Sequence, residues 1–229
     1  HGIPTYKRIY GDWTKPQMSS WKNVLLSHSI IPIQQYSYTT GKNASDAALI
    51  IDAMEILYSK SVDGFCIVSS DSDFTKLAAR LREAGMLVIG MGEKKTPKPF
   101  IAACERFKYL EVLAKMAKQT AEVDSKPSES QDDVKNGMTS KQQIVETIKT
   151  IIAEVSDEDG WAYLGEIGSI LNKRYPDFDT RNYGFTKLTP FVSSLKKFEV
   201  RSVKTSNPSI SLKYVRVKQS QSTTRRKKS

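Results

Sequence analysis

The first half of the chain alternates between two hydrophobic periodicities. Five short apolar runs predict strands, at residues 6–10, 30–38, 65–69, 87–91 and 108–110. Four segments between them have apolar residues at helical spacing and predict helices, at residues 18–28, 45–58, 74–84 and 99–105. Strands that alternate with helices favour βαβ units. We therefore predict an α/β fold in which helices flank a mostly parallel sheet.

A polar segment separates this domain from a second one. Residues 118–139 are rich in Gln, Ser, Thr, Glu, Asp and Lys and have no apolar periodicity, so we expect a flexible linker after a first domain at residues 1–117. Residues 140–217 then predict a small α+β domain, with helices at 141–155, 161–175 and 184–195 and strands at 198–203 and 211–217. Three helices followed by a hairpin form a winged-helix pattern, and residues 218–229 form a basic tail.

Charge is unevenly distributed along the chain. The net charge is +10, and residues 141–229 hold 17 Lys and Arg against 9 Asp and Glu, a net of +8. A basic region of this kind is typical of nucleic-acid binding, although a solubilising tail fits the charge equally well. No run of about 18 apolar residues predicts a membrane span. The two cysteines, Cys66 and Cys104, do not suggest a disulfide framework, so we expect a reducing, cytoplasmic location.

The string Ser69–Phe74 carries the strongest candidate chemistry. Asp71 and Asp73 follow the predicted strand at 65–69, and ligands of α/β sheets bind outside the carboxyl ends of the strands. Two neighbouring carboxylates repel each other unless a proton or a cation lies between them. Mg²⁺ prefers carboxylate oxygens together with substrate phosphates. These residues therefore predict part of a metal site.

Asp46 is a candidate third acid. It lies at the start of the predicted helix at 45–58, where it serves either as a helix cap or as a further ligand at the same edge of the sheet. An Asp-x-Asp string also occurs in glycosyltransferases and in aspartyl-phosphate phosphatases. The short domain and the position of Asp46 favour neither, so we expect Asp46, Asp71 and Asp73 to form one acidic site.

The first domain resembles a known family in four ordered blocks. These are Tyr10–Trp13, Gly41–Asp46, Leu49–Met54 and Val68–Phe74. Over residues 1–112 the chain resembles the NYN domains of the LabA-like group, in the PIN-like nuclease superfamily. The resemblance implies a ribonuclease that uses Mg²⁺ or Mn²⁺, with Asp46, Asp71 and Asp73 as catalytic and metal-binding residues.

One departure from the family pattern concerns the start of the chain. The family begins with a central strand that ends in Asp, and nothing before Tyr6 matches this strand. We therefore expect a fragment that lacks its first strand and one metal ligand. Activity is then expected of the full-length protein, and not necessarily of this chain.

The second domain resembles the OST-HTH (LOTUS) domain over residues 140–217. The matching blocks are Gly160–Gly168, Tyr175–Asp179 and Tyr183–Phe185. The resemblance implies RNA binding or a protein contact, and basic side chains are expected to contact phosphate. Tyr183 and Phe185 are read as core residues in preference to base-stacking ones. The candidate RNA-binding residues are Lys42, Lys94 and Lys95 in the first domain and Arg181, Lys187, Lys196, Lys197, Arg201 and Lys204 in the second.

Two functional hypotheses remain open at this point. The first is a metal-dependent ribonuclease with a C-terminal RNA-binding module. The second is a non-catalytic RNA-binding or regulatory adaptor that keeps the nuclease fold. Lys42 precedes Asp46 by four residues and is placed either beside a bound phosphate or in a solvated loop. RNA is the expected partner under both hypotheses, a protein partner is a further expectation, and no membrane contact is expected.

Overall fold

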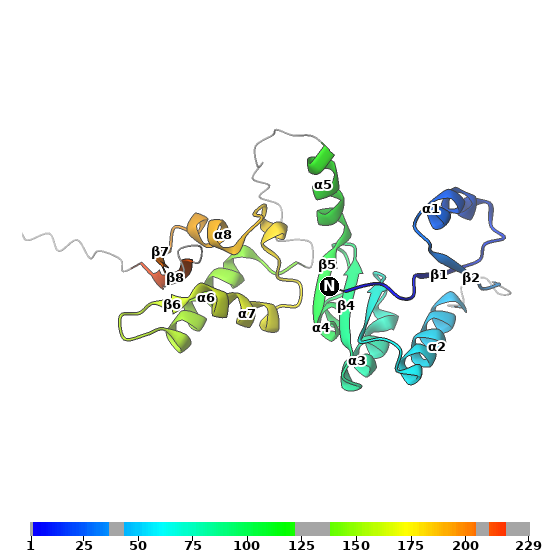
Figure 1. The fold of residues 1–229 in the computed structure, drawn as a ribbon, viewed down its shortest axis with the longest axis horizontal. Coiled ribbons are helices and arrows are strands. Elements are labelled where there is room, and N and C mark those ends of the chain that lie inside the picture. Colours follow the sequence, from blue (N-terminus) through cyan, green and yellow to red (C-terminus); the bar gives the residue numbers. More distant parts are fainter. Residues whose placement is uncertain (1, 37–43, 122–137, 205–210, 219–229) are drawn as a thin grey trace, which may run out of the picture.

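The computed structural model describes residues 2–36, 44–121, 138–204 and 211–218. They form two units that lie side by side, the first drawn from blue to green and the second from green to red (Figure 1). Expected features at residues 37–43, 122–137 and 219–229 lie outside the described part of the chain. These include Lys42, the middle of the expected linker and most of the basic tail.

The first unit contains five strands and the helices that connect them. The strands are β1 (Arg8–Gly11), β2 (Ile31–Gln34), β3 (Gly64–Val68), β4 (Leu87–Gly92) and β5 (Arg106–Tyr109). The α-helices are α1 (Lys22–Ser27), α2 (Ala44–Ser59), α3 (Thr75–Glu83), α4 (Lys98–Ala103) and α5 (Leu110–Ala121). Short 3-10 helices precede α1 and α3, η1 at Pro16–Trp21 and η2 at Ser72–Phe74. The predicted α/β class with parallel strands flanked by helices is confirmed.

The parallel strands form two sheets instead of one. β1 pairs only with β2, whereas β3, β4 and β5 pair in that order. Within the described residues, no strand pairs with strands of both sheets to join them. Helix α2 connects the two parts, because Asp52 accepts hydrogen bonds from Arg8 and Tyr10 of β1 while Ala53 is buried in the core beneath β3–β5. The expected absence of a first strand stays a prediction.

The core of the first unit lies around β4 and β5. Val88 of β4 and Leu81 of α3 are fully buried, and Phe107 packs edge-to-face against Phe100 of α4. Side chains pack closely onto the backbone at Gly90, where a Cβ atom would lie 2.6 Å from both Cys104 Sγ and a ring carbon of Phe107. These contacts position the carboxyl ends of β3 and β4, where the predicted acids follow.

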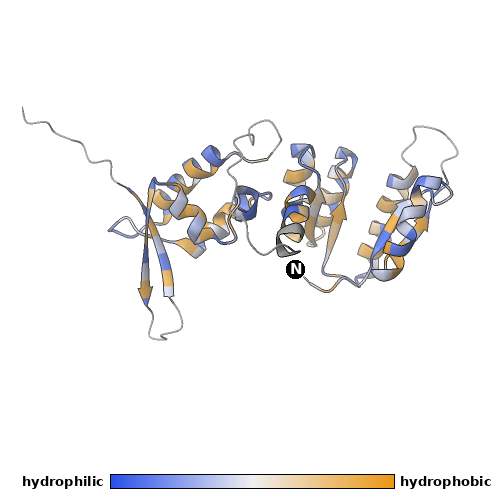
Figure 2. Ribbon diagram, turned by 90° about the horizontal axis from the view of Figure 1, so that it is seen from above, coloured by the Kyte–Doolittle hydropathy of each residue, from blue (hydrophilic) through white to orange (hydrophobic). Residues whose placement is uncertain are grey.

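The second unit has its own core and a three-stranded antiparallel sheet. Its elements are α6 (Lys141–Val155), β6 (Ala162–Tyr163), α7 (Leu164–Arg174), η4 (Thr180–Tyr183), α8 (Leu188–Ser194), β7 (Phe198–Lys204) and β8 (Ser211–Val217). Ile148 and Leu171 pack with Phe191 in a core separate from that of the first unit. Figure 2 shows hydrophobic segments in the strands of the first unit and in the helices of the second. Tyr183 and Phe185 pack against the second core, as predicted.

Several predicted elements differ from the structure, and most of the other bounds differ by only a few residues. Helix α5 was not predicted, and it runs to Ala121, past the expected end of the first domain at residue 117. It follows β5 directly, so no turn residue marks its start. Residues 162–163 form strand β6 instead of the first turn of a helix, because they pair with Tyr214 and Val215 of β8. The expected third helix at 184–195 begins only at Leu188, after η4.

The two units dock through the free edge of β5. Phe107 N donates a hydrogen bond of 2.7 Å to Pro176 O, and the ammonium group of Lys108 pairs with Asp179. Burial by itself would raise the pKa of Asp179, but its hydrogen bonds with Arg181 and Lys108 outweigh this effect and lower the pKa. The second unit therefore hydrogen-bonds to an edge of the sheet that would otherwise be open.

Asp177 is the centre of this docking interface. It is only 4% exposed and accepts hydrogen bonds from Tyr109 Oη at 3.0 Å, Thr139 N at 2.9 Å and Thr139 Oγ1 at 2.8 Å. Tyr183 Oη in turn donates to Thr139 O at 2.8 Å, and Met138 is buried in the core of the first unit. Residues 138–139, which the sequence assigned to a flexible linker, are thus part of a packed interface.

Candidate functional site

The segment after β3 is fixed to the end of β4 by backbone hydrogen bonds. Ser69 N donates to Met91 O at 2.9 Å, and Glu93 N donates to Ser70 Oγ at 2.8 Å. Gly92 allows this close approach, because a Cβ atom there would lie 2.5 Å from Ser69 O. Two strand ends therefore form one ordered base for the acidic residues that follow.

Asp71 and Asp73 lie on this base in a defined turn. Ser69 Oγ accepts a hydrogen bond of 3.1 Å from Asp71 N, and Asp71 Oδ1 accepts one of 2.9 Å from Asp73 N. Asp71 thereby caps the 3-10 helix η2, and both acids are exposed. A carboxylate offers about four acceptor positions, so Asp71 can accept a further ligand besides the hydrogen bond from Asp73 N.

Asp46 reaches the same region from a different element. It lies in the first turn of α2, a helix that contacts η2. Its pKa is raised by partial burial, and the negative charges of Asp71 and Asp73 raise it further. The structure thus brings Asp46 close enough to Asp71 and Asp73 for their charges to repel, although Asp46 precedes them by 25 and 27 positions along the chain.

The donor set fits a divalent cation in chemistry and charge. Carboxylate oxygens are the ligands that Mg²⁺ and Mn²⁺ prefer, and a cation would relieve the repulsion that raises the pKa of Asp46. The fit in geometry is incomplete. Across the residues that the structure describes, no three acidic, His or Cys side chains are gathered closely enough to enclose a metal ion. The acids converge on one edge of the sheet without forming a closed coordination shell.

Two predicted basic residues lie beside the acids. Lys94 N donates to the Glu111 carboxylate of α5 at 2.9 and 3.1 Å, and Lys95 Nζ forms an exposed ion pair of 2.6 Å with Glu93. This pair raises the pKa of Lys95. Because Glu93 N also bonds to Ser70, both lysines border the acidic turn. Lys42 lies outside the described residues.

Arg201 of the second unit belongs to a cluster of cations and aromatic rings on its sheet. The Arg201 guanidinium lies 4.2 Å from the ring centre of Trp161 and 5.6 Å from that of Tyr214. The Arg216 guanidinium also lies over Trp161, 4.6 Å from the ring centre. Sequence reasoning missed Trp161, Tyr214 and Arg216. The register of the predicted hairpin, which pairs Arg201 with Tyr214 and Glu199 with Arg216, was a signal for Tyr214 and Arg216.

The other predicted basic residues do not form a single patch with Arg201. Arg181 pairs with Asp179 at 3.0 Å and so belongs to the docking interface. Lys197 forms an ion pair of 3.7 Å with Glu146, and Lys196 precedes it between α8 and β7. Lys187 and Lys204 are exposed, at the start of α8 and the end of β7.

Three solved structures show partial likeness to the chain. A protein of unknown function from Vibrio parahaemolyticus is 19% identical, with 46% of this chain and 68% of that chain covered and a TM-score of 0.40. An uncharacterized protein from Nitrosomonas europaea is 27% identical, with coverages of 43% and 92% and a TM-score of 0.31. A protein segment from Chromobacterium violaceum is 30% identical, with coverages of 35% and 85% and a TM-score of 0.28. No curated protein matches the chain.

Two family models match the two units. Residues 1–111 match the NYN domain and residues 139–210 match the OST-HTH/LOTUS domain, in agreement with both resemblances. NYN domains are nucleases that generally use divalent metal ions, and OST-HTH/LOTUS domains bind RNA. None of the helices in the described ranges is long and apolar enough to cross a membrane. The chain is an NYN-domain protein with a C-terminal OST-HTH/LOTUS domain.

Proposed function

We propose that the protein hydrolyses phosphodiester bonds of RNA with the help of Mg²⁺ or Mn²⁺. The convergence of Asp46, Asp71 and Asp73 supports this proposal: α2 contacts η2, and a bound cation would offset the negative charges that, after partial burial, raise the pKa of Asp46. Neither metal dependence nor RNA as the substrate follows from the family alone. Both are therefore proposals that rest on the residues at this edge of the sheet.

The acidic residues would hold the cation and the lysines would hold the substrate. A divalent cation at such a site supplies an activated water molecule and neutralises charge on the phosphoryl oxygens. The turn fixes Asp71 through the hydrogen bonds of Ser69 and Asp73, so this carboxylate is oriented before any ligand arrives. Lys94 and Lys95 border the site and can bind a neighbouring phosphate as point charges.

The first experiment asks whether cleavage occurs and depends on metal. Labelled single-stranded RNA incubated with the full-length protein should be cleaved in Mn²⁺ or Mg²⁺ and should stay intact in EDTA, because hydrolysis requires the cation held by the acids. Cleavage that persists in EDTA would contradict the proposal. Binding of the RNA without cleavage in either metal would instead support the non-catalytic adaptor.

The OST-HTH domain should bind RNA mainly through phosphate contacts. Its basic residues lie on the surface, and it has a core of its own, so residues 140–229 can be tested as a separate domain. The logarithm of the binding constant should fall linearly with the logarithm of salt concentration, by about 0.7 per phosphate contacted on a single strand. Fluorescence anisotropy between low and high salt measures this slope. A slope near zero would sink the proposal of an electrostatic RNA-binding module.

A further inference from the structure

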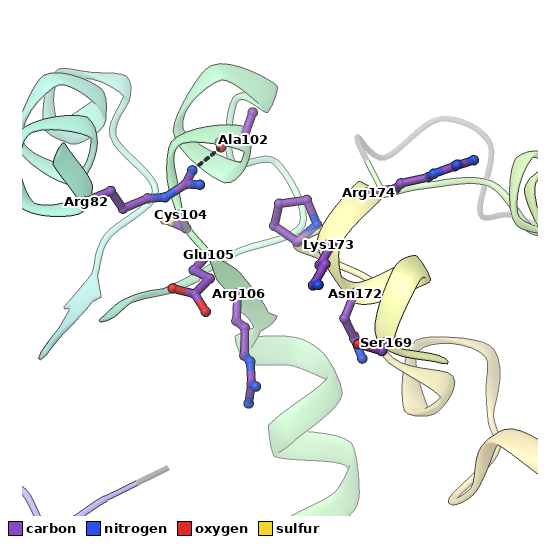
Figure 3. Close-up of a pocket in the computed structure, with 10 residues that line it drawn as sticks. Arg82, Ala102, Cys104, Glu105, Arg106, Ser169, Asn172, Lys173 and Arg174 are labelled. Atoms are coloured by element: carbon purple, nitrogen blue, oxygen red, sulfur yellow. Dashed lines mark hydrogen bonds between the residues drawn. The ribbon is translucent and has the colours of Figure 1, made fainter. Parts of the chain in front are cut away.

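A cavity of about 540 Å³ lies between the two domains. The NYN domain contributes the end of α3 and the segment from α4 into β5, and the OST-HTH domain contributes the end of α7 (Figure 3). This volume falls within the range of small-molecule and cofactor pockets. The cavity exists only because the docking interface holds the two domains together.

Four basic side chains from both domains line this cavity. Arg82 and Arg106 come from the NYN domain, Lys173 and Arg174 come from the OST-HTH domain, and Glu105 is the one acidic residue among the lining side chains. In Figure 3 the side chains of Arg106 and Lys173 lie on opposite sides of the space. The cavity therefore has a net positive charge and would attract an anion.

Two of these cations are held in position by neighbouring groups. Arg82 Nη1 donates to Ala102 O and Ala103 O, both at 3.3 Å, and Arg174 Nη2 pairs with Glu154 at 2.7 Å. In Figure 3 the Arg174 side chain points away from the cavity. A guanidinium has five N–H donors, so the two bonds of Arg82 leave others for a ligand. A guanidinium group held in this way suits phosphate, because it can donate two parallel hydrogen bonds to the phosphate oxygens.

A purely structural explanation accounts for only part of this arrangement. Arg82 lies in the last turn of α3, and Lys173 and Arg174 lie in the last turn of α7, where cations offset the helix dipole. This does not explain Arg106, which begins strand β5. Nor does it explain why the basic ends of two helices from different domains face one cavity.

We propose that this cavity binds phosphate groups of an RNA backbone, so that both domains hold one RNA molecule. The proposal rests on the proposed RNA-binding function and names a site for it that spans the two domains. The cavity is separate from the acidic site. Asp73 precedes α3 and Arg82 lies in its last turn, and the nine residues of this helix span about 13 Å. An RNA of several nucleotides is needed to reach both places.

The test measures RNA binding in EDTA, where no metal-dependent cleavage can occur. Arg106→Gln combined with Lys173→Gln should weaken binding of a labelled single-stranded RNA by about tenfold at low salt and should reduce the salt slope by about 0.7 per lost phosphate contact. Lys173→Gln alone, at an exposed position, should give a smaller loss in the same direction. The control is Lys15→Gln with Lys22→Gln, which removes two exposed charges at η1 and α1 and should leave the binding constant unchanged.

Two results would overturn the proposal. One is equal RNA affinity and equal salt slope for the wild type and the Arg106→Gln, Lys173→Gln variant, with circular dichroism showing both folded. The other is a variant that loses binding of inorganic phosphate but keeps its RNA affinity, which would assign the cavity to free phosphate. Neither readout depends on catalysis. Absence of RNA cleavage would therefore refute the proposed activity and leave the result for the cavity intact.

Discussion

Asp71→Asn is expected to lower the rate of metal-dependent RNA cleavage by about 100-fold or more, since even residues that only support a metal ligand cost about 10- to 100-fold when lost. The substitution removes one negative charge from the acidic site but keeps an oxygen atom that can accept the hydrogen bond from Asp73 N. The turn at Ser72–Phe74 should therefore keep its shape, and the effect should come from the metal.

Asp63→Asn is the matched control for this variant. Asp63 is exposed and precedes β3, at the opposite end of the strand from Asp71. Cleavage rates of both variants and the wild type, measured with labelled RNA in Mn²⁺, give the comparison. The increase in melting temperature on addition of Mn²⁺ gives a second readout, which should be smaller for Asp71→Asn. Equal rates for all three proteins would end the case for Asp71 as a metal ligand.

Asp177→Asn is expected to weaken docking of the two domains by about 3 kcal/mol, because each hydrogen bond to a charged group contributes about 1.5–3 kcal/mol. The buried carboxylate accepts from one hydroxyl group of Tyr109 and from two donors of Thr139. An asparagine side chain can place its oxygen atom toward Tyr109 Oη and Thr139 N and its amide nitrogen toward Thr139 Oγ1, which can accept. The loss therefore comes from the negative charge, which strengthens all three hydrogen bonds of the aspartate.

Small-angle scattering and denaturant unfolding together test this expectation. The radius of gyration should rise as the domains separate, and the unfolding transition should split in two, since each domain has its own core. Asp159→Asn, at an exposed position after α6, is the control. RNA affinity should fall as it does for the cavity variant, because the cavity needs both domains. A single unchanged transition and an unchanged radius of gyration would show that Asp177 does not hold the interface.

Local signals allowed several elements to be predicted closely. Helix α6 occupies the predicted residues 141–155, and its start is marked by a capping box in which Ser140 and Gln143 satisfy each other's backbone N–H groups. Strand β8 likewise matches residues 211–217. The turn that contains Asp71 and Asp73 could be predicted for the same reason. A strand, a turn and a helix follow one another there, and their residue patterns are local.

The sequence by itself thus determined the fold class and the two domains, and it named Asp46, Asp71 and Asp73 as the candidate acids. The tertiary structure decided the rest, because it depends on contacts between residues far apart along the chain. Strand β6 forms only through pairing with β8, and Asp177 becomes buried only where Tyr109 and Thr139 meet it. The mutual repulsion of Asp46 with Asp71 and the basic cavity between the domains arise in the same way. Periodicity and turn residues report local conformation, whereas docking and long-range electrostatics exist only after the chain has folded.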